Sequence, residues 1–302
     1  MSFMHSHKLP LSVLAGITTV MLTMSPYTAS WLGLVLGYFS VVPLFIIGLR
    51  YPLIYLIIAT GVTSSFMGVI GGAAATSFLL LQGIPVFFVC LLASKRQNKK
   101  SVPANKILTI LTAIVLLLMT LFFLWILAFK RTPIEVETTL WLKGVISEEA
   151  IVDKLKATIS IIIPSIIGAS WVITTAINAL VAQGILSLMG ESLRPFPSKN
   201  DFVSTYAWDW SFVFLAGAAV TLMKPFYPNL AAFGLNAMLL AAVPLIATGL
   251  RTFYLWLMQW QIAKFWFFMI LFLMIVLVWP MLFIVGLGIL EPLLKLYPRL
   301  SK

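Results

Sequence analysis

Charged residues are scarce in this 302-residue chain: Asp, Glu, Lys and Arg make up only 10% of it, and 61% is hydrophobic. Soluble globular proteins average about 25% charged and about 45–50% apolar residues. Nine stretches contain no charged residue: 9–23, 30–49, 51–70, 73–93, 107–129, 157–189, 210–223, 229–249 and 265–288. A helix needs about 20 mainly apolar residues to cross a bilayer. The composition therefore excludes a soluble domain and predicts an all-α, polytopic transmembrane helical bundle of about nine spans, within a range of eight to ten.

Histidine and cysteine are almost absent. His5 and His7 lie in the polar N-terminal tail, and Cys90 is the single cysteine. This excludes a disulfide framework and the ligand spacing of a zinc site, so we expect no metal and no cofactor. Catalytic motifs such as His-Glu-x-x-His, Gly-x-Ser-x-Gly and the Walker loop are missing too. Because the predicted spans hold no ionisable group, we expect neither an enzyme nor a proton-relay pump nor an ion-coupled antiporter.

The charges that are present are mostly basic, with 20 Lys and Arg against 9 Asp and Glu, a net charge of +11. No basic stripe accompanies base-stacking aromatic residues, so we expect no nucleic-acid partner. Nine spans with a cytoplasmic N-terminus place a net +8 inside and +3 outside, as the positive-inside rule favours. This count puts Arg251 inside and Glu291 outside. The side of the basic C-terminal tail stays open, because one miscounted span would move it to the cytoplasm.

The first hydrophobic stretch has two interpretations. We favour a first span that acts as its own insertion signal, because eight further spans follow; residues 1–30 also fit a secretory signal peptide cleaved near Ser30. We predict a six-helix membrane core over 1–190 and a C-terminal transmembrane extension over 191–302, within one integrated membrane domain. The sixth helix, 153–188, is longer than a bilayer is thick, and we expect it to bend at Pro164.

Neutral polar residues are the candidates for ligand binding inside the predicted spans. They are the amides Gln82, Asn178, Gln183 and Asn236. Each can donate and accept a hydrogen bond, and Trp171 could provide an apolar wall. Together they predict a pocket for a small planar or amide-bearing solute. The alternative is that these side chains bond to neighbouring helices or to backbone carbonyls near a kink.

Small residues mark the places where helices can approach closely. Ala15 and Thr19 form one small-x-x-x-small pair, and Gly33 and Gly37 form another. Such pairs allow two backbones to pack together in a membrane. They predict either packing within the chain or a docking face for a partner membrane subunit.

A basic segment, KRQNKKSVPANK at 95–106, separates two of the spans. Its charge serves as a topology signal and suits contact with anionic lipid headgroups. It also supports an alternative function: a non-transporting membrane scaffold that recruits a partner through basic cytoplasmic residues, namely Lys95, Arg96, Lys99 and Lys100.

The sequence from residue 195 onward resembles the YybS-like family of uncharacterised bacterial membrane proteins, a domain of unknown function. The residues that carry the resemblance are Pro195, Pro197, Phe202, Trp208, Trp210, Asn236, Gly249-Leu250, Pro280, Leu287-Gly288, Glu291 and Arg299. The six-helix part of that family is similar to the substrate-binding S components of energy-coupling-factor transporters. The resemblance thus implies an S-component-like core before residue 190 and additional helices after it.

The resemblance also implies a function. S components bind vitamin-like solutes and dock on a membrane coupling subunit through Ala-x-x-x-Ala in their first helix. Here the nearest match is Ala15-x-x-x-Thr19, a departure that puts coupling in doubt. Our leading hypothesis is an integral protein of the bacterial cytoplasmic (inner) membrane that binds or takes up a small solute.

Overall fold

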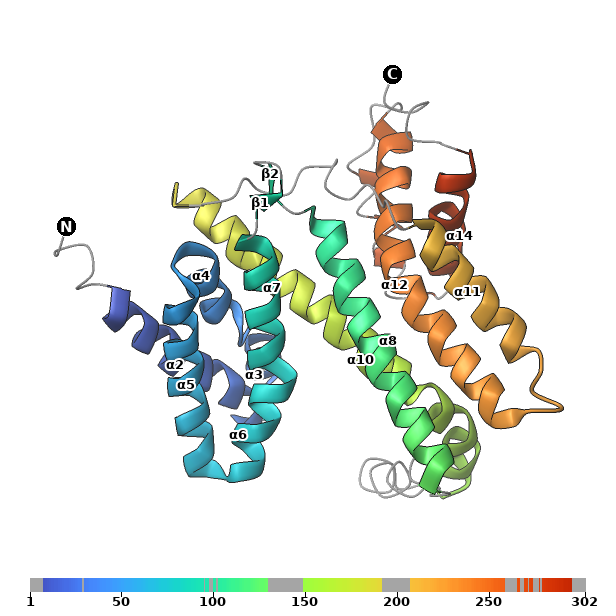
Figure 1. The fold of residues 1–302 in the computed structure, drawn as a ribbon, viewed down its shortest axis with the longest axis horizontal. Coiled ribbons are helices and arrows are strands. Elements are labelled where there is room, and N and C mark those ends of the chain that lie inside the picture. Colours follow the sequence, from blue (N-terminus) through green and yellow to red (C-terminus); the bar gives the residue numbers. More distant parts are fainter. Residues whose placement is uncertain are drawn as a thin grey trace. The chain divides into compact units, whose positions relative to one another are not determined.

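The structure is a computed structural model that describes residues 8–28, 30–94, 96–97, 100–101, 103–129, 149–191, 207–258 and 279–294, with short pieces of 265–277. The elements in these ranges are helical except for β1 (Arg96–Gln97) and β2 (Lys100–Ser101). These two-residue strands pair antiparallel, in the basic segment between two spans. The prediction of an all-helical protein is therefore confirmed (Figure 1).

The helices follow one another with short connections. The first group is α2 (Lys8–Met24), the 3-10 turn η1 (Ser25–Thr28), α3 (Trp31–Tyr38), α4 (Val42–Arg50), α5 (Leu53–Ile70), α6 (Gly72–Phe78), the π-helical turn η2 (Leu79–Gly83) and α7 (Ile84–Ser94). The second group is α8 (Ala104–Phe129), α10 (Glu149–Leu188), α11 (Ala207–Thr221), α12 (Pro228–Met258) and α14 (Trp279–Leu294).

Seven segments of the described chain are long and apolar enough to cross a membrane. They are Lys8–Thr28, Trp31–Arg50, Leu53–Ile70, Gly72–Ser94, Ala104–Leu121, Ile161–Leu188 and Asn229–Met258. They coincide with seven of the nine charge-free stretches, so a multi-pass membrane protein is supported. Helix α11 has 15 residues and the apolar part of α14 spans Pro280–Pro292, both shorter than a typical span. The total of about nine spans stays a prediction.

The chain divides into two compact units. Unit 1 comprises Met1–Pro103 and Ile173–Ser198, and unit 2 comprises Ala104–Val172 and Lys199–Lys302. This division differs from the predicted boundary at residue 190, because α8 and the first part of α10 belong with the C-terminal helices. Helix α10 contributes residues to both units, and each unit is described by itself below.

In unit 1, α2 and α5 pack so closely that Gly16 has no room for a side chain. A Cβ at this position would lie 2.7 Å from the carbonyl oxygen of Ala59 and 2.9 Å from the Cβ of Val62. The Thr63 hydroxyl donates a hydrogen bond to the Gly16 carbonyl oxygen at 3.1 Å. The two helices are therefore joined by backbone contact, the arrangement that small residues permit in a membrane.

The four small residues predicted for packing are buried or closely packed. Ala15 and Thr19 are 9% and 0% exposed. A Cβ at Gly33 would collide with the carbonyl oxygen of Ser25, and one at Gly37 would collide with the η1 turn. Packing within the chain thus accounts for Gly33 and Gly37, and the burial of Ala15 and Thr19 leaves them little surface. A docking role for these residues stays a prediction.

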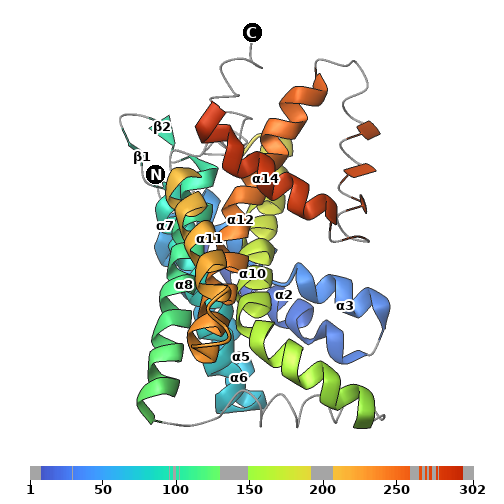
Figure 2. The same ribbon diagram turned by 90° about the vertical axis from the view of Figure 1, so that its right-hand side faces the viewer.

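Glycines also allow close contacts between helices in unit 2. Along α11 and α12, a Cβ at Gly217 would lie 2.7 Å from the carbonyl oxygen of Gly234, and one at Gly234 would lie 2.8 Å from that of Gly217. Helix α14 crosses α12 (Figure 2), where a Cβ at Gly249 would collide with the backbone of Ile284. These contacts hold α11, α12 and α14 together.

A buried charge in unit 2 corrects one expectation. Arg251 lies inside the candidate span Asn229–Met258 and is 6% exposed, so this span does hold an ionisable group. Glu291 of α14 is 8% exposed and lies within electrostatic range of Arg251. The two residues therefore cannot lie on opposite faces of the membrane. Placing Arg251 inside and Glu291 outside was wrong, because α12 continues past the charge at which the predicted span ended.

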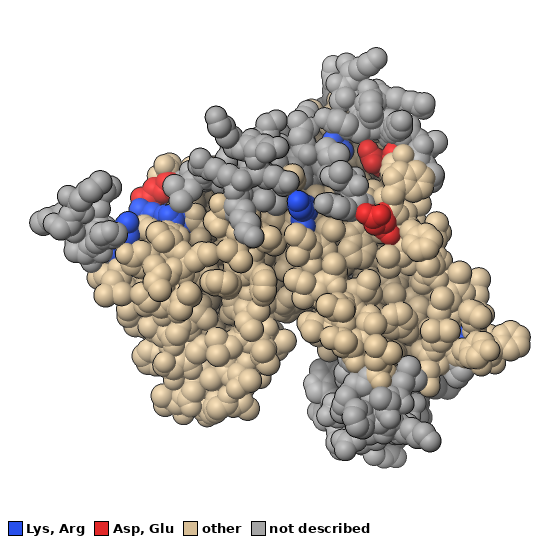
Figure 3. All heavy atoms as spheres, viewed as in Figure 1, with Lys and Arg blue, Asp and Glu red and all other residues tan. Residues whose placement is uncertain are grey.

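Charged residues gather at one end of unit 1, where blue and red atoms lie together at the left of Figure 3. Arg50 donates to Glu191 in an ion pair, and its guanidinium lies 4.8 Å from the centre of the Tyr51 ring. The Lys8 ammonium lies 5.9 Å from the same ring. Lys8, Arg50 and Glu191 thus share one end, as the predicted topology requires of three residues assigned to the cytoplasmic side.

Candidate functional site

The second candidate span of unit 1, Trp31–Arg50, is interrupted near its middle. Helix α3 ends at Tyr38 and α4 begins at Val42. Between them the chain makes short-range bonds, with the Ser40 N–H donating to the Gly37 carbonyl at 3.2 Å. A break at this position places backbone polar groups at membrane depth, where they need partners inside the protein.

Pro43 explains the break. It stands in the first turn of α4 and has no N–H, so it cannot donate to the carbonyl of Phe39 as a helical residue would. The Val42 N–H bonds that carbonyl instead, at 3.1 Å. In a continuous helix Val42 would have bonded Tyr38. The carbonyl of Tyr38 is therefore left without its helical partner.

Asn178 of α10 supplies the missing partner. Its side chain is 0% exposed, and its Nδ2 donates to the Tyr38 carbonyl oxygen at 2.8 Å. The same Nδ2 donates to the carbonyl of Thr174, one turn earlier in α10, also at 2.8 Å. Both N–H groups of the amide are thus used by carbonyl oxygens.

These two bonds fix the orientation of the Asn178 amide, and they do not involve its oxygen, Oδ1. Turning the amide round would place Oδ1 against two carbonyl oxygens, which are acceptors themselves. Oδ1 therefore stays on the other side, where it is buried and has no hydrogen-bond partner. A buried acceptor without a donor costs about 1–3 kcal/mol. Asn178 thus holds an acceptor at depth that no donor in the described part of the chain satisfies.

Asn236 in unit 2 makes a similar arrangement at the Pro164 bend of α10. In a regular helix the Ser165 N–H would donate to the Ile161 carbonyl. Here the Ser165 N–H donates to Oδ1 of Asn236 at 2.9 Å, and Nδ2 of Asn236 donates to the Ile161 carbonyl at 2.6 Å. The amide is inserted into one broken helical hydrogen bond and satisfies both of its ends.

The two asparagines differ in one respect. Nδ2 of Asn236 also bonds the Ala232 carbonyl at 2.8 Å, so its amide has no N–H left and its Oδ1 already accepts a bond. This matches the alternative in which a polar residue serves a kink, and a ligand-binding role for Asn236 stays a prediction. Nδ2 of Asn178 likewise donates two hydrogen bonds to backbone carbonyls. Its Oδ1, in contrast, accepts no hydrogen bond from the described residues.

The other predicted site residues are divided between the units. Gln82 lies in the π-helical turn η2 of unit 1, and its Oε1 is also buried without a partner. Such turns are frequent at functional sites. Gln183, 5% exposed, lies in the part of α10 that belongs to unit 1. Trp171 is half-buried in unit 2, seven residues before Asn178 on the same helix.

Two features of unit 1 were not predicted from the sequence. The break after Tyr38 was missed, although Pro43 inside a charge-free stretch is the signal that could have located it. Three buried hydroxyl oxygens of unit 1 were not predicted to lack a partner either. Like Oδ1 of Asn178, they have no hydrogen-bond partner among the described residues: those of Thr19, which was predicted only as a packing residue, Thr23 and Ser64. Hydroxyl groups are common in membrane helices and give no clear signal in sequence.

Comparisons with protein-family models, with curated proteins and with solved structures find no match to this chain.

Proposed function

We propose that the protein is a membrane-embedded binding protein for a small uncharged solute that carries an N–H or O–H group. One observation carries the proposal: Oδ1 of the fully buried Asn178 has no partner, although the amide that bears it is held by two hydrogen bonds. A solute donor at this oxygen would remove the cost of the unsatisfied acceptor.

The chemistry of the site defines the class of solute. An amide oxygen is a neutral acceptor, so it selects a donor without requiring charge. The interrupted span beside it follows a pattern known from transporters, in which broken helices expose backbone groups to a substrate near the membrane midplane. An amide-bearing or hydroxyl-bearing solute fits this site. The proposed role is binding or uptake, with no chemical conversion.

We place the protein in the bacterial cytoplasmic membrane with its N-terminus in the cytoplasm. The resemblance to the YybS-like family and to S components supports the location. The position of Lys8 and Arg50 at one end of unit 1 supports the orientation, because basic residues favour the cytoplasmic side.

Ligand-induced stabilisation tests the proposal. Purified protein in lipid nanodiscs is heated with a panel of uncharged vitamins, nucleobases and small amides, and the unfolding temperature is recorded. A solute at one hundred times its Kd adds about 2.7 kcal/mol to the stability of the state that binds it. We expect at least one compound to raise the unfolding temperature by several degrees, and its analogue with the donor methylated to have no effect.

Two variants make the test specific. Asn178→Ala removes the acceptor and should abolish the shift caused by the compound. Asn236→Ala is the matched control, because the same residue type is removed from a site whose oxygen is already bonded. It should lower the starting stability and keep the ligand-induced shift. The proposal fails if no compound stabilises the wild type, or if Asn178→Ala keeps the shift.

A further inference from the structure

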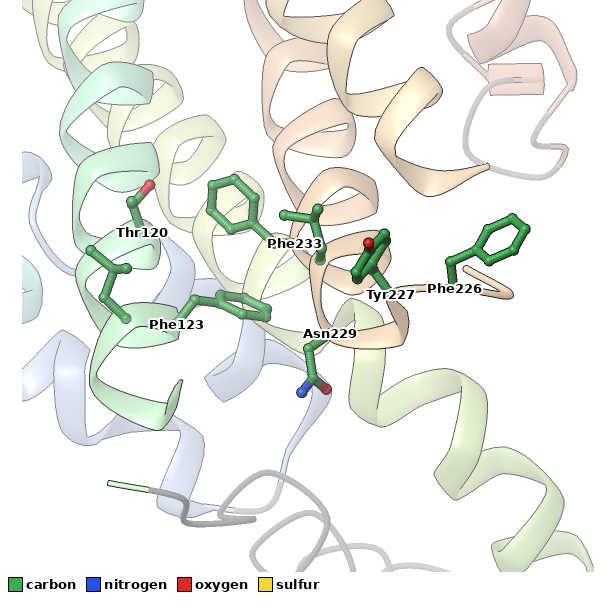
Figure 4. Close-up of a pocket in the computed structure, with 8 residues that line it drawn as sticks. Thr120, Phe123, Phe226, Tyr227, Asn229 and Phe233 are labelled. Carbon is green, nitrogen blue, oxygen red and sulfur yellow. The ribbon is translucent and has the colours of Figure 1, made fainter. Parts of the chain in front are cut away.

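Unit 2 contains a cavity of about 430 Å³ that none of the predicted site residues lines. It lies between α8 and the beginning of α12, and its lining is almost entirely apolar: Thr120, Phe123, Leu124, Phe226, Tyr227, Asn229, Leu230 and Phe233. Figure 4 shows Phe123 of α8 and Phe233 of α12 reaching toward one another, with a ring-centroid distance of 5.5 Å. The volume lies within the range of ligand pockets, about 300–1,000 Å³.

The polar groups of the cavity are few. The Thr120 hydroxyl already donates to the carbonyl of Leu116 at 2.7 Å. The Asn229 amide and the Tyr227 hydroxyl remain, and Figure 4 shows both on the side of the turn before α12. The cavity therefore suits a long apolar group with one polar end.

The cavity lies where one candidate span begins, since Asn229–Met258 starts at Asn229, which lines it. Helix α8 continues past Thr120 to Phe129. Phe226 and Tyr227, which are 78% and 57% exposed, stand at this level. Exposed aromatic residues at span ends typically lie between the headgroups and the acyl chains of the bilayer. A lipid chain is the apolar group that this boundary supplies.

A basic residue lies next to the opening. Lys224 is exposed in the turn between α11 and α12, two residues before Phe226. Two residues span at most about 7 Å of extended chain, so its ammonium is within reach of a headgroup whose chain enters the cavity. A basic residue at the membrane surface attracts anionic lipids.

We propose that this cavity holds one hydrocarbon chain of an anionic phospholipid, with the lipid phosphate beside Lys224. Phe123 and Phe233 contact the chain, and Asn229 and Tyr227 face its ester groups. The site is separate from Asn178, since all of its residues belong to unit 2.

Photolabelling tests the proposal. The full chain is reconstituted in nanodiscs with phosphatidylglycerol whose acyl chain carries a diazirine, then irradiated, and the adducts are mapped by mass spectrometry. We expect saturable labelling of Phe123 and Phe233. Thr120→Phe fills the cavity from α8 and should reduce this labelling by at least about fivefold, since the chain loses its space. Leu117→Phe is the matched control, because Leu117 is exposed on the same helix and does not line the cavity.

Two further comparisons keep the test decisive. Asn229→Phe closes the opening at an exposed position and replaces Thr120→Phe if that variant does not fold. In the wild type, phosphatidylcholine with the same diazirine should label the cavity less than the labelled phosphatidylglycerol does. Lys224→Gln should make the two lipids label it equally. Equal labelling of the cavity and of the exposed Phe212 on α11, unchanged by the filling variants, means ordinary boundary lipid and overturns the proposal. Equal labelling by the two lipids in the wild type overturns the headgroup assignment.

Discussion

Asn236→Leu is expected to lower the free energy of unfolding by about 2–4 kcal/mol, because it removes the partners of two buried backbone groups at once. The Ser165 N–H loses its acceptor and the Ile161 carbonyl loses its donor. Reversible unfolding in mixed detergent micelles measures the change. Asn178→Leu is the matched comparison: it frees one carbonyl, that of Tyr38, and also removes an unsatisfied oxygen, so its cost should be clearly smaller.

A second variant tests the cause of this effect. Pro164→Ala gives residue 164 an N–H and allows α10 to close, so that Ser165 can bond Ile161 directly. The double variant Pro164→Ala/Asn236→Leu should therefore be more stable, by at least about 1 kcal/mol in the free energy of unfolding, than the sum of the two single effects predicts. Such non-additivity is expected of residues that interact. Strict additivity, or equal costs for the two asparagine variants, would show that Asn236 does not sustain the bend.

Gly249→Ala should destabilise unit 2 by about 2–3 kcal/mol, even though alanine favours a helix by up to about 1 kcal/mol over glycine. The new Cβ would collide with the backbone carbonyl of Ile284, which cannot move without displacing α14 from α12. Gly288→Ala should behave in the same way, because its Cβ would collide with the Leu245 carbonyl.

Gly286 provides the control for this prediction; it lies in α14, the helix of Gly288. A Cβ there meets nothing within 4 Å, so Gly286→Ala should be neutral or slightly stabilising. The measurement is the same unfolding experiment in micelles. If Gly249→Ala matches Gly286→Ala, the close crossing of α12 and α14 is not the contact that holds these helices.

The membrane-spanning character of the chain was predictable because it depends on composition over long windows. The six predicted spans before residue 190, and the eighth charge-free stretch at 229–249, are apolar helices in the structure. The limits of single elements were less predictable where a charge lies inside a helix. Arg251 was assigned to a loop, but burial beside Glu291 lets α12 continue to Met258.

The candidate site was predictable only in part. Asn178 stood out as a neutral polar residue at depth, but its partner is the backbone carbonyl of Tyr38, 140 positions away in sequence. Such a contact depends on tertiary packing and leaves no local pattern. Three residues that carry the family resemblance, Asn236, Gly249 and Gly288, have structural roles in unit 2, at the bend of α10 and at the crossing of α12 and α14.

The surroundings of Asn178 Oδ1 test the account most directly. A density map of the protein in nanodiscs, with the most stabilising solute bound, should show a nitrogen or oxygen of that solute about 2.7–3.2 Å from Oδ1. The amide should keep its two bonds to the Tyr38 and Thr174 carbonyls. A protein donor at Oδ1, or a single water there with the solute bound elsewhere, would contradict the proposed binding site.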